Sequence, residues 1–205
     1  MATQLVASWR VVVDFVGLDL EDDGIVDVLA SNTDMHLGLS SSEFVTTVHA
    51  SVAADSFHSA VDKVLDVVEQ AAPEAETLRL MDPLVTIADI ADLAGVTRQA
   101  VRNWSLGLRK SGFPRPLSIV GDGVRVWRQA DVDAWLDRAV ALGSGHKYGS
   151  AAFIALYNEL LQEADSEDAE IWATASDVTE VQRQRISRRV SRGAPSRPAS
   201  AVPAR

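Results

Sequence analysis

Residues 1–82 carry two different apolar periodicities in turn. Alternating or continuous apolar runs predict strands, and apolar residues three and four positions apart predict helices. In chain order the pattern predicts a strand, a helix, two strands, a helix and a final strand. The predicted segments are Trp9–Val16, Glu21–Asn32, Met35–Leu39, Phe44–Val52, a helix that Ser56 caps and that ends before Pro73, and Thr77–Met81.

The two middle strands are expected to form a hairpin through Ser40–Ser42. The second of them should place a row of alternate residues on the inner face of a sheet: Phe44, Thr46, Val48, Ala50 and Val52. Strand, helix, strand repeated twice is the order of two split βαβ units, which predicts a ferredoxin-like α+β domain over residues 1–82. Such a fold does not fix a function. We expect it to serve dimerisation, or to sense a small-molecule or protein effector.

The next segment, residues 83–142, is mainly helical and opens with two short helices. Ile87–Ala94 has apolar residues on one face, and Gly95 ends it where the chain must adopt a positive φ. Thr97 can cap the following helix, whose inward residues are Ala100, Val101 and Trp104. The small Gly95 turn and the apolar wedge between the helices predict a helix-turn-helix.

An antiparallel hairpin and a closing helix follow. Two prolines in Phe113–Pro116 end the helical region. Leu117–Val120 and Val124–Arg128 read as strands around Gly121-Asp122-Gly123. Asp131–Leu142 is a predicted helix with apolar residues on one face. Trp104, Trp127 and Trp135 share the spacing of that apolar face, so we expect them in the core.

Residues 85–138 resemble the winged helix-turn-helix of the MerR and excisionase (AlpA-like) DNA-binding proteins. The matching residues are Thr86–Ala91, Gly95–Thr97, Ala100–Trp104, Phe113–Pro116, Arg125–Trp127 and Asp131–Leu136. The resemblance implies a recognition helix in the major groove and a wing that holds the backbone through Arg125. The insert Ser105–Gly112 is longer and more basic than the family pattern.

The polar face of the second short helix suits phosphates and base edges. The candidate contacts with double-stranded DNA are Thr97, Arg98, Gln99, Arg102, Asn103, Arg109, Lys110, Arg115, Arg125 and Arg128. These residues predict a sequence-specific DNA-binding protein, most simply a homodimeric transcription regulator. Two alternatives stay open: an excisionase-like architectural factor that bends DNA, and an adaptor or antitoxin whose helix-turn-helix binds protein.

The charge distribution supports a local rather than a global attraction for DNA. The net charge is −10, yet between residues 98 and 128 seven basic residues face a single acid, Asp122. A local positive field can attract phosphates over about 8–10 Å in physiological salt. Residues 182–205 form a basic tail expected to lack structure, and residues 143–181 read as a linker and an amphipathic helix.

The chain offers little for catalysis or metal binding. It contains no cysteine, and its four histidines lie in different predicted elements. Asp19–Gly24 imitates the start of a calcium loop, but the twelfth position is Ala30 where a bidentate acid is required. We therefore expect no enzymatic activity, no cofactor and no metal. Without a membrane-spanning segment, we expect a cytoplasmic, nucleoid-associated protein.

Overall fold

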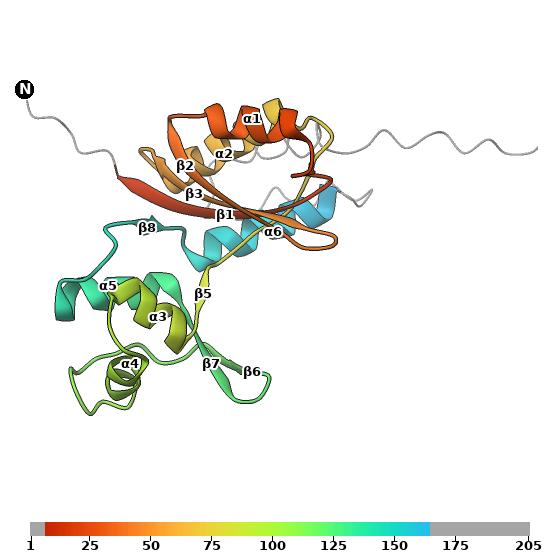
Figure 1. Cartoon of the computed structure of the whole chain (residues 1–205). Coiled ribbons are helices and arrows are strands. Elements are labelled where there is room, and N and C mark those ends of the chain that lie inside the picture. The colour runs from red at the N-terminus through yellow and green to blue at the C-terminus, as the bar shows by residue number, and fades with distance from the viewer. Residues whose placement is uncertain (1–6, 165–205) are drawn as a thin grey trace, which may run out of the picture.

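The computed structural model describes residues 7–164, so the predicted basic tail lies outside the described residues. Its elements form a mixed α+β structure around two separate hydrophobic cores. We call the elements around them the first lobe (β1–β4, β8, α1, α2 and α6) and the second lobe (β5–β7 and α3–α5). Figure 1 shows the second lobe below the sheet of the first. Across residues 7–164, no helix is both long enough and apolar enough to cross a bilayer.

The first lobe is built on an antiparallel sheet with the strand order β2-β3-β1-β4. The strands are β1 (Ser8–Val16), β2 (Met35–Ser41), β3 (Thr46–Ala53) and β4 (Glu76–Leu80). Alternate residues of β1 and β3 enter the core, and Val11, Val13 and Val48 are fully buried. The six predicted elements therefore occur in the predicted order, with bounds close to those expected.

Two helices cover one face of this sheet (Figure 1). Helix α1 (Asp23–Ser31) begins after Asp22, whose carboxylate accepts from the backbone of Gly24 and Ile25. The acidic run of the imitation calcium loop therefore starts a helix. Helix α2 (Phe57–Ala71) begins after Ser56, as predicted, and buries six apolar side chains, namely Phe57, Ala60, Val61, Val64, Leu65 and Val68.

The predicted β2–β3 connection is wrong in one detail. Strand β2 continues through Ser41, and the turn lies at residues 42–45, closed by hydrogen bonds from the backbone N–H and hydroxyl of Ser42 to the Val45 carbonyl. Phe44 sits in this turn, 75% exposed, and does not join the inner face of β3. The alternation of apolar residues extends past the end of the strand because the turn residues happen to continue the pattern.

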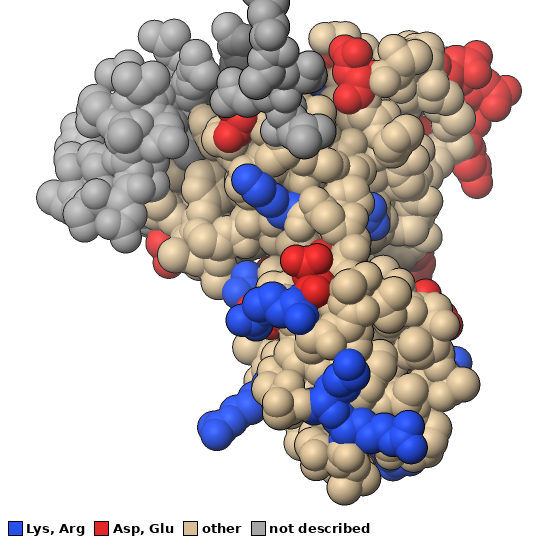
Figure 2. Space-filling view, turned by 90° about the vertical axis from the view of Figure 1, so that its left-hand side faces the viewer, with Lys and Arg blue, Asp and Glu red and all other residues tan. Residues whose placement is uncertain are grey.

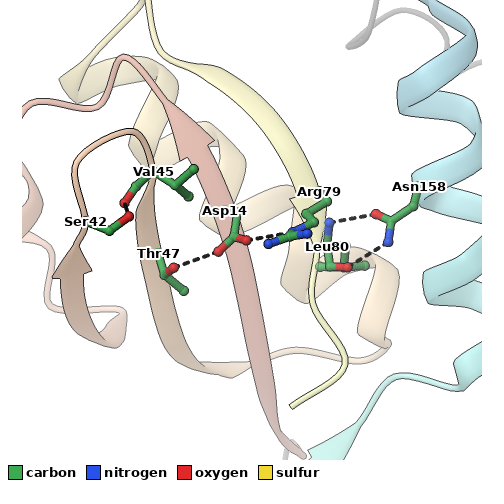
Figure 3. Close-up of polar contacts among 7 residues, drawn as sticks. All are labelled: Asp14, Ser42, Val45, Thr47, Arg79, Leu80 and Asn158. Atoms are coloured by element: carbon green, nitrogen blue, oxygen red, sulfur yellow. Dashed lines mark hydrogen bonds and ion pairs between the residues drawn. The ribbon is translucent and has the colours of Figure 1, made fainter. Parts of the chain in front are cut away.

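The chain returns to the first lobe after the second lobe is complete. Strand β8 (Lys147–Tyr148) pairs in parallel with β1, and helix α6 (Ala151–Ala164) packs against β4. Ile154 and Tyr157 are buried in the first core. The Asn158 side chain accepts from the Leu80 N–H at 2.7 Å and donates to its carbonyl at 2.8 Å (Figure 3). Strand β4 lies at the edge of the sheet, and this amide satisfies the Leu80 backbone groups that a further strand would otherwise pair with.

The second lobe combines three helices with a small sheet in the order β5-β7-β6. Its elements are β5 (Leu84–Val85), α3 (Ile87–Ala94), α4 (Arg98–Ser105), β6 (Ser118–Val120), β7 (Val124–Arg128) and α5 (Gln129–Val140). The core contains Trp104, Trp127 and Trp135, each no more than 7% exposed. Their predicted core positions are confirmed.

Candidate nucleic-acid interface

Helix α3 starts with a complete capping box. The Asp89 carboxylate accepts from the Thr86 N–H at 2.7 Å, and the Thr86 hydroxyl accepts from the Asp89 N–H at 3.4 Å. The box uses neither the N–H of Ile87 nor that of Ala88, which occupy the first helical turn and have no acceptor within the helix. The helix ends at Gly95, whose φ of 62° is the predicted left-handed stop.

Helix α4 is held by its apolar face. Thr97 caps it by accepting from the Ala100 N–H at 3.2 Å, so this predicted contact residue also has a structural role. Val101 and Trp104 are buried, whereas Arg98, Gln99 and Arg102 are exposed. The partly buried Asn103 accepts a hydrogen bond at 3.0 Å from Gln99. This pair is aligned along the helix surface and presents an amide donor and an amide acceptor.

A groove of about 390 Å³ runs between α4, the start of α3 and the β6–β7 hairpin. It is lined by Thr86, Ile87, Ala88, Arg98, Arg102, Gly123, Val124 and Arg125. Three predicted contact residues, Arg98, Arg102 and Arg125, thus meet on one concave surface. The N-terminal turn of α3 lies on the same surface, where its backbone N–H groups and helix dipole favour an anion.

The remaining predicted contacts lie outside this groove. Arg109 and Lys110 belong to the insert, and Lys110 donates to the Ala139 carbonyl at 3.2 Å. Arg115 is exposed on the segment that enters β6. These positions can reach only a ligand that extends beyond the groove.

Arg128 is engaged within the protein. Its Nε donates to Asp82 Oδ2 at 2.6 Å and its Nη2 donates to Asp82 Oδ1 at 3.3 Å. The hydrogen bond to this carboxylate raises the pKa of Arg128. The predicted phosphate contact of Arg128 would therefore compete with Asp82.

The insert is folded against the helices. The carbonyl of Asn103 accepts from the backbone N–H of Leu108 at 2.9 Å, and Trp135 Nε1 donates to the Ser111 carbonyl at 3.0 Å. Phe113 packs edge-on against Trp135, with ring centroids 4.8 Å apart. This aromatic backing ties the segment between α4 and the hairpin to α5, so the orientation of α4 relative to the hairpin is set by core packing.

The β6–β7 hairpin has an apolar surface that the sequence analysis missed. Ile119 pairs with Arg125 across the hairpin, and Val120 pairs with Val124. Exposed fractions reach 61% for Ile119 and 58% for Leu117. The sequence contained a signal for this surface, because Leu117, Ile119 and Val120 are apolar residues of one short strand. A three-stranded sheet this small can bury only one of its faces, so some of these side chains must stay exposed.

The charged side chains are unequally distributed over the two lobes. On the face drawn in Figure 2, Lys and Arg gather on the lower lobe, while Asp and Glu project at the upper margin. Within residues 7–164 there is no group of three His, Asp or Glu side chains able to hold a metal ion. Comparisons with protein-family models, curated proteins and solved structures found no match.

Proposed function

We propose that this protein binds double-stranded DNA sequence-specifically and acts as a homodimeric transcription regulator in the cytoplasm, at the nucleoid. In this proposal the second lobe is a winged helix-turn-helix in which α4 is the recognition helix and the β6–β7 hairpin is the wing. The first lobe is a ferredoxin-like dimerisation or effector domain. Its antiparallel strand order β2-β3-β1-β4, with two helices on one face, supports that assignment.

The groove that unites Arg98, Arg102 and Arg125 carries the proposal. Three guanidinium groups and a helix N-terminus provide donors for phosphate oxygens, and the fork of an arginine also fits the O6 and N7 atoms of guanine. The Gln99–Asn103 amide pair on the exposed face of α4 adds donors and acceptors for adenine edges. One surface can thus both position the protein on the DNA phosphates and discriminate between bases.

The first experiment is a selection from a random double-stranded DNA pool with the full chain at physiological salt. An enriched inverted repeat supports a sequence-specific dimer, with half-sites separated by about 34–36 Å or a multiple of it. An enriched single site retains specificity and removes the symmetric dimer. Absence of enrichment contradicts sequence-specific binding.

Variants of the groove then separate base contacts from phosphate contacts. Arg102→Ala should weaken binding to the selected site by about 1–3 kcal/mol and relax its base preference, as for an arginine that reads a base. Arg125→Ala should weaken all sequences alike and lower the slope of log affinity against log salt by about 0.9. Arg138→Ala, on the exposed surface of α5 and outside the groove, is the control with equal charge loss. Equal affinity of the wild type and both groove variants would refute the docking.

A second candidate function is supported by the apolar hairpin. Exposed Leu117, Ile119 and Val120 are typical of a protein-binding surface rather than of a backbone-binding wing. In that case the protein is an adaptor or antitoxin. It would form a stable complex with another protein, and its DNA affinity would be absent at every salt concentration.

A further inference from the structure

The sheet of the first lobe has a second face, turned away from α1 and α2 (Figure 1). Along β1, Arg10, Val12 and Asp14 alternate with the core residues and therefore lie on this face. The register sets Arg10 opposite Ser51 on β3 and beside Tyr148 on β8, and Val12 opposite His49. Arg10, His49, Ser51 and Tyr148 thus form one polar cluster, which we call the Arg10 cluster.

The two arginines of this face differ in their partners. Arg79 donates to the buried Asp14 at 2.7 Å, and Asp14 also accepts from Thr47 at 2.6 Å (Figure 3). Arg10 is half-buried, and its Nε is buried without a hydrogen-bond partner. Among residues 7–164 no carboxylate lies within 4.0 Å of its guanidinium. A buried N–H donor without an acceptor is costly, and an oxyanion is a group that would satisfy it.

The neighbours of Arg10 supply further donors. Burial raises the pKa of Tyr148, Ser144 and Arg10 lower it, and Asp133 raises it, with a net upward shift, so the phenol stays protonated. Its hydroxyl is buried, with the Ser144 and Asp133 side chains nearby, and forms no hydrogen bond of standard geometry. Burial and Arg10 lower the pKa of His49, although Asp14 acts in the opposite direction. A neutral imidazole and two hydroxyl groups can all donate to an oxyanion.

The cluster is held in place by the returning chain. His146 Nδ1 lies 3.1 Å from the Ser8 hydroxyl and 3.4 Å from the Ser51 hydroxyl. Two residues earlier, Ser144 is hydrogen-bonded through its N–H to Asp133 of α5 at 2.7 Å. The Arg10 cluster therefore lies where the chain passes from the second lobe back to the first.

We propose that the Arg10 cluster is a binding site for a small oxyanion, a carboxylate or a phosphate group carried by a small molecule. Arg10 provides the charge, and the Tyr148 and Ser51 hydroxyls and the His49 imidazole provide the neutral donors. The site is separate from the DNA groove, which none of these residues lines. It goes beyond the proposed function, because anion binding here requires no DNA.

The experiment is an NMR titration of the full chain with sodium phosphate or sodium acetate, at constant ionic strength set with chloride. An anion beside Arg10 should shift the imidazole resonances of His49 and raise the pKa of His49, since a nearby negative charge favours the protonated ring. Arg10→Gln should weaken this binding about tenfold or more, the loss expected for a charge-assisted hydrogen bond. Arg10→Lys keeps the positive charge but lacks the planar guanidinium group, so its anion affinity should lie between those of the wild type and Arg10→Gln.

Arg98→Gln is the matched control, with the same charge loss in the DNA groove. Its His49 response should equal that of the wild type. A preference for phosphate over acetate, or the reverse, identifies which oxyanion the site takes. The proposal is overturned if neither anion changes His49, or if Arg10→Gln, shown to be folded by its amide spectrum, responds like the wild type. Absence of DNA binding by the wild-type chain, together with an intact His49 response, would refute only the proposed function.

Discussion

The contact between Asp82 and Arg128 should fasten the second lobe to the chain that enters it. Arg128 is the last residue of β7, paired with Leu84 of β5, and the next residue, Gln129, donates its N–H to the Pro83 carbonyl at 2.8 Å. The ion pair thus joins the segment between β4 and β5 to the far end of the hairpin. Its side chains are 20% exposed for Arg128 and 25% exposed for Asp82.

The magnitude follows from this partial burial. Opposite charges at the observed N–O separation attract by about 5–6 kcal/mol at an effective dielectric constant of about 20. Desolvation of both groups offsets much of that attraction. Exposed pairs contribute about 0–1 kcal/mol, and removing one partner of a fully buried pair costs about 3–5 kcal/mol. For this pair we expect Asp82→Asn to lower the free energy of unfolding by about 2 kcal/mol.

A double-mutant cycle measures the interaction directly. Asp82→Asn, Arg128→Gln and the double variant are unfolded in urea and followed by the fluorescence of the buried tryptophans. The coupling energy should be about 1–2 kcal/mol, since each single variant leaves the other side chain without its partner. Arg138→Gln, whose Nε donates to the Ala134 carbonyl and which forms no ion pair within the described residues, should change stability little. Coupling below about 0.5 kcal/mol would refute the reasoning.

The Arg128→Gln variant also tests the predicted contact of Arg128 with a DNA phosphate. A lost phosphate contact lowers the salt slope of DNA binding by about 0.9. Because Asp82 already occupies the Arg128 guanidinium, we expect Arg128→Gln to leave that slope unchanged. A lowered slope with unchanged stability would reverse the assignment and place Arg128 on the DNA.

Two further predictions concern the first lobe. Gly149→Ala should destabilise it by about 1–3 kcal/mol, because the added Cβ would overlap the Cε1, Cζ and Cδ1 atoms of the Phe57 ring. Gly38→Ala is the control, because the nearest atom to its added Cβ is 3.8 Å away. Equal urea midpoints for the two variants would contradict this prediction. Burial and Arg10 lower the pKa of His49 below its ordinary value of 6.5. Below pH 6.5 the unfolded chain therefore binds more protons than the folded chain, and the free energy of unfolding falls as the pH decreases from 6.5 to the lowered pKa. His49→Gln should remove this loss, about 1.4 kcal/mol for each unit by which the pKa is lowered. Parallel curves of unfolding free energy against pH for His49→Gln and the wild type, between pH 8 and pH 5, would contradict this role of His49.

Local pattern and capping chemistry were sufficient to predict most elements. Thr97 and Gly95 act at the helix ends where they were expected, because capping depends on residues only a few positions away. Phe44 was misplaced because alternation alone cannot show where a strand stops and a turn begins. The pairing of Asp82 with Arg128 could not be predicted, since it joins residues that only the folded sheet brings together.

The candidate groove also depends on contacts between residues that are distant in the sequence. The residues alone indicated that Arg98, Arg102 and Arg125 have suitable chemistry, and only the family resemblance implied that they contact the same DNA. Arg125 reaches the groove because the aromatic contacts of Phe113 and Trp127, with ring centroids 5.8 Å apart, fix the hairpin beside α4. Residues distant in sequence meet through core packing, which residue pattern does not encode.

The path of the chain gives the second lobe two attachments to the first. It is entered through the Asp82–Arg128 contact and left through the Ser144–Asp133 hydrogen bonds, after which β8 and α6 complete the first lobe. A lobe held at both ends has less orientational freedom than one joined by a single linker, because both connections must change together for it to rotate. Tyr148 of the Arg10 cluster lies on the returning segment, whereas the helices α1 and α2 cover the opposite face of the sheet.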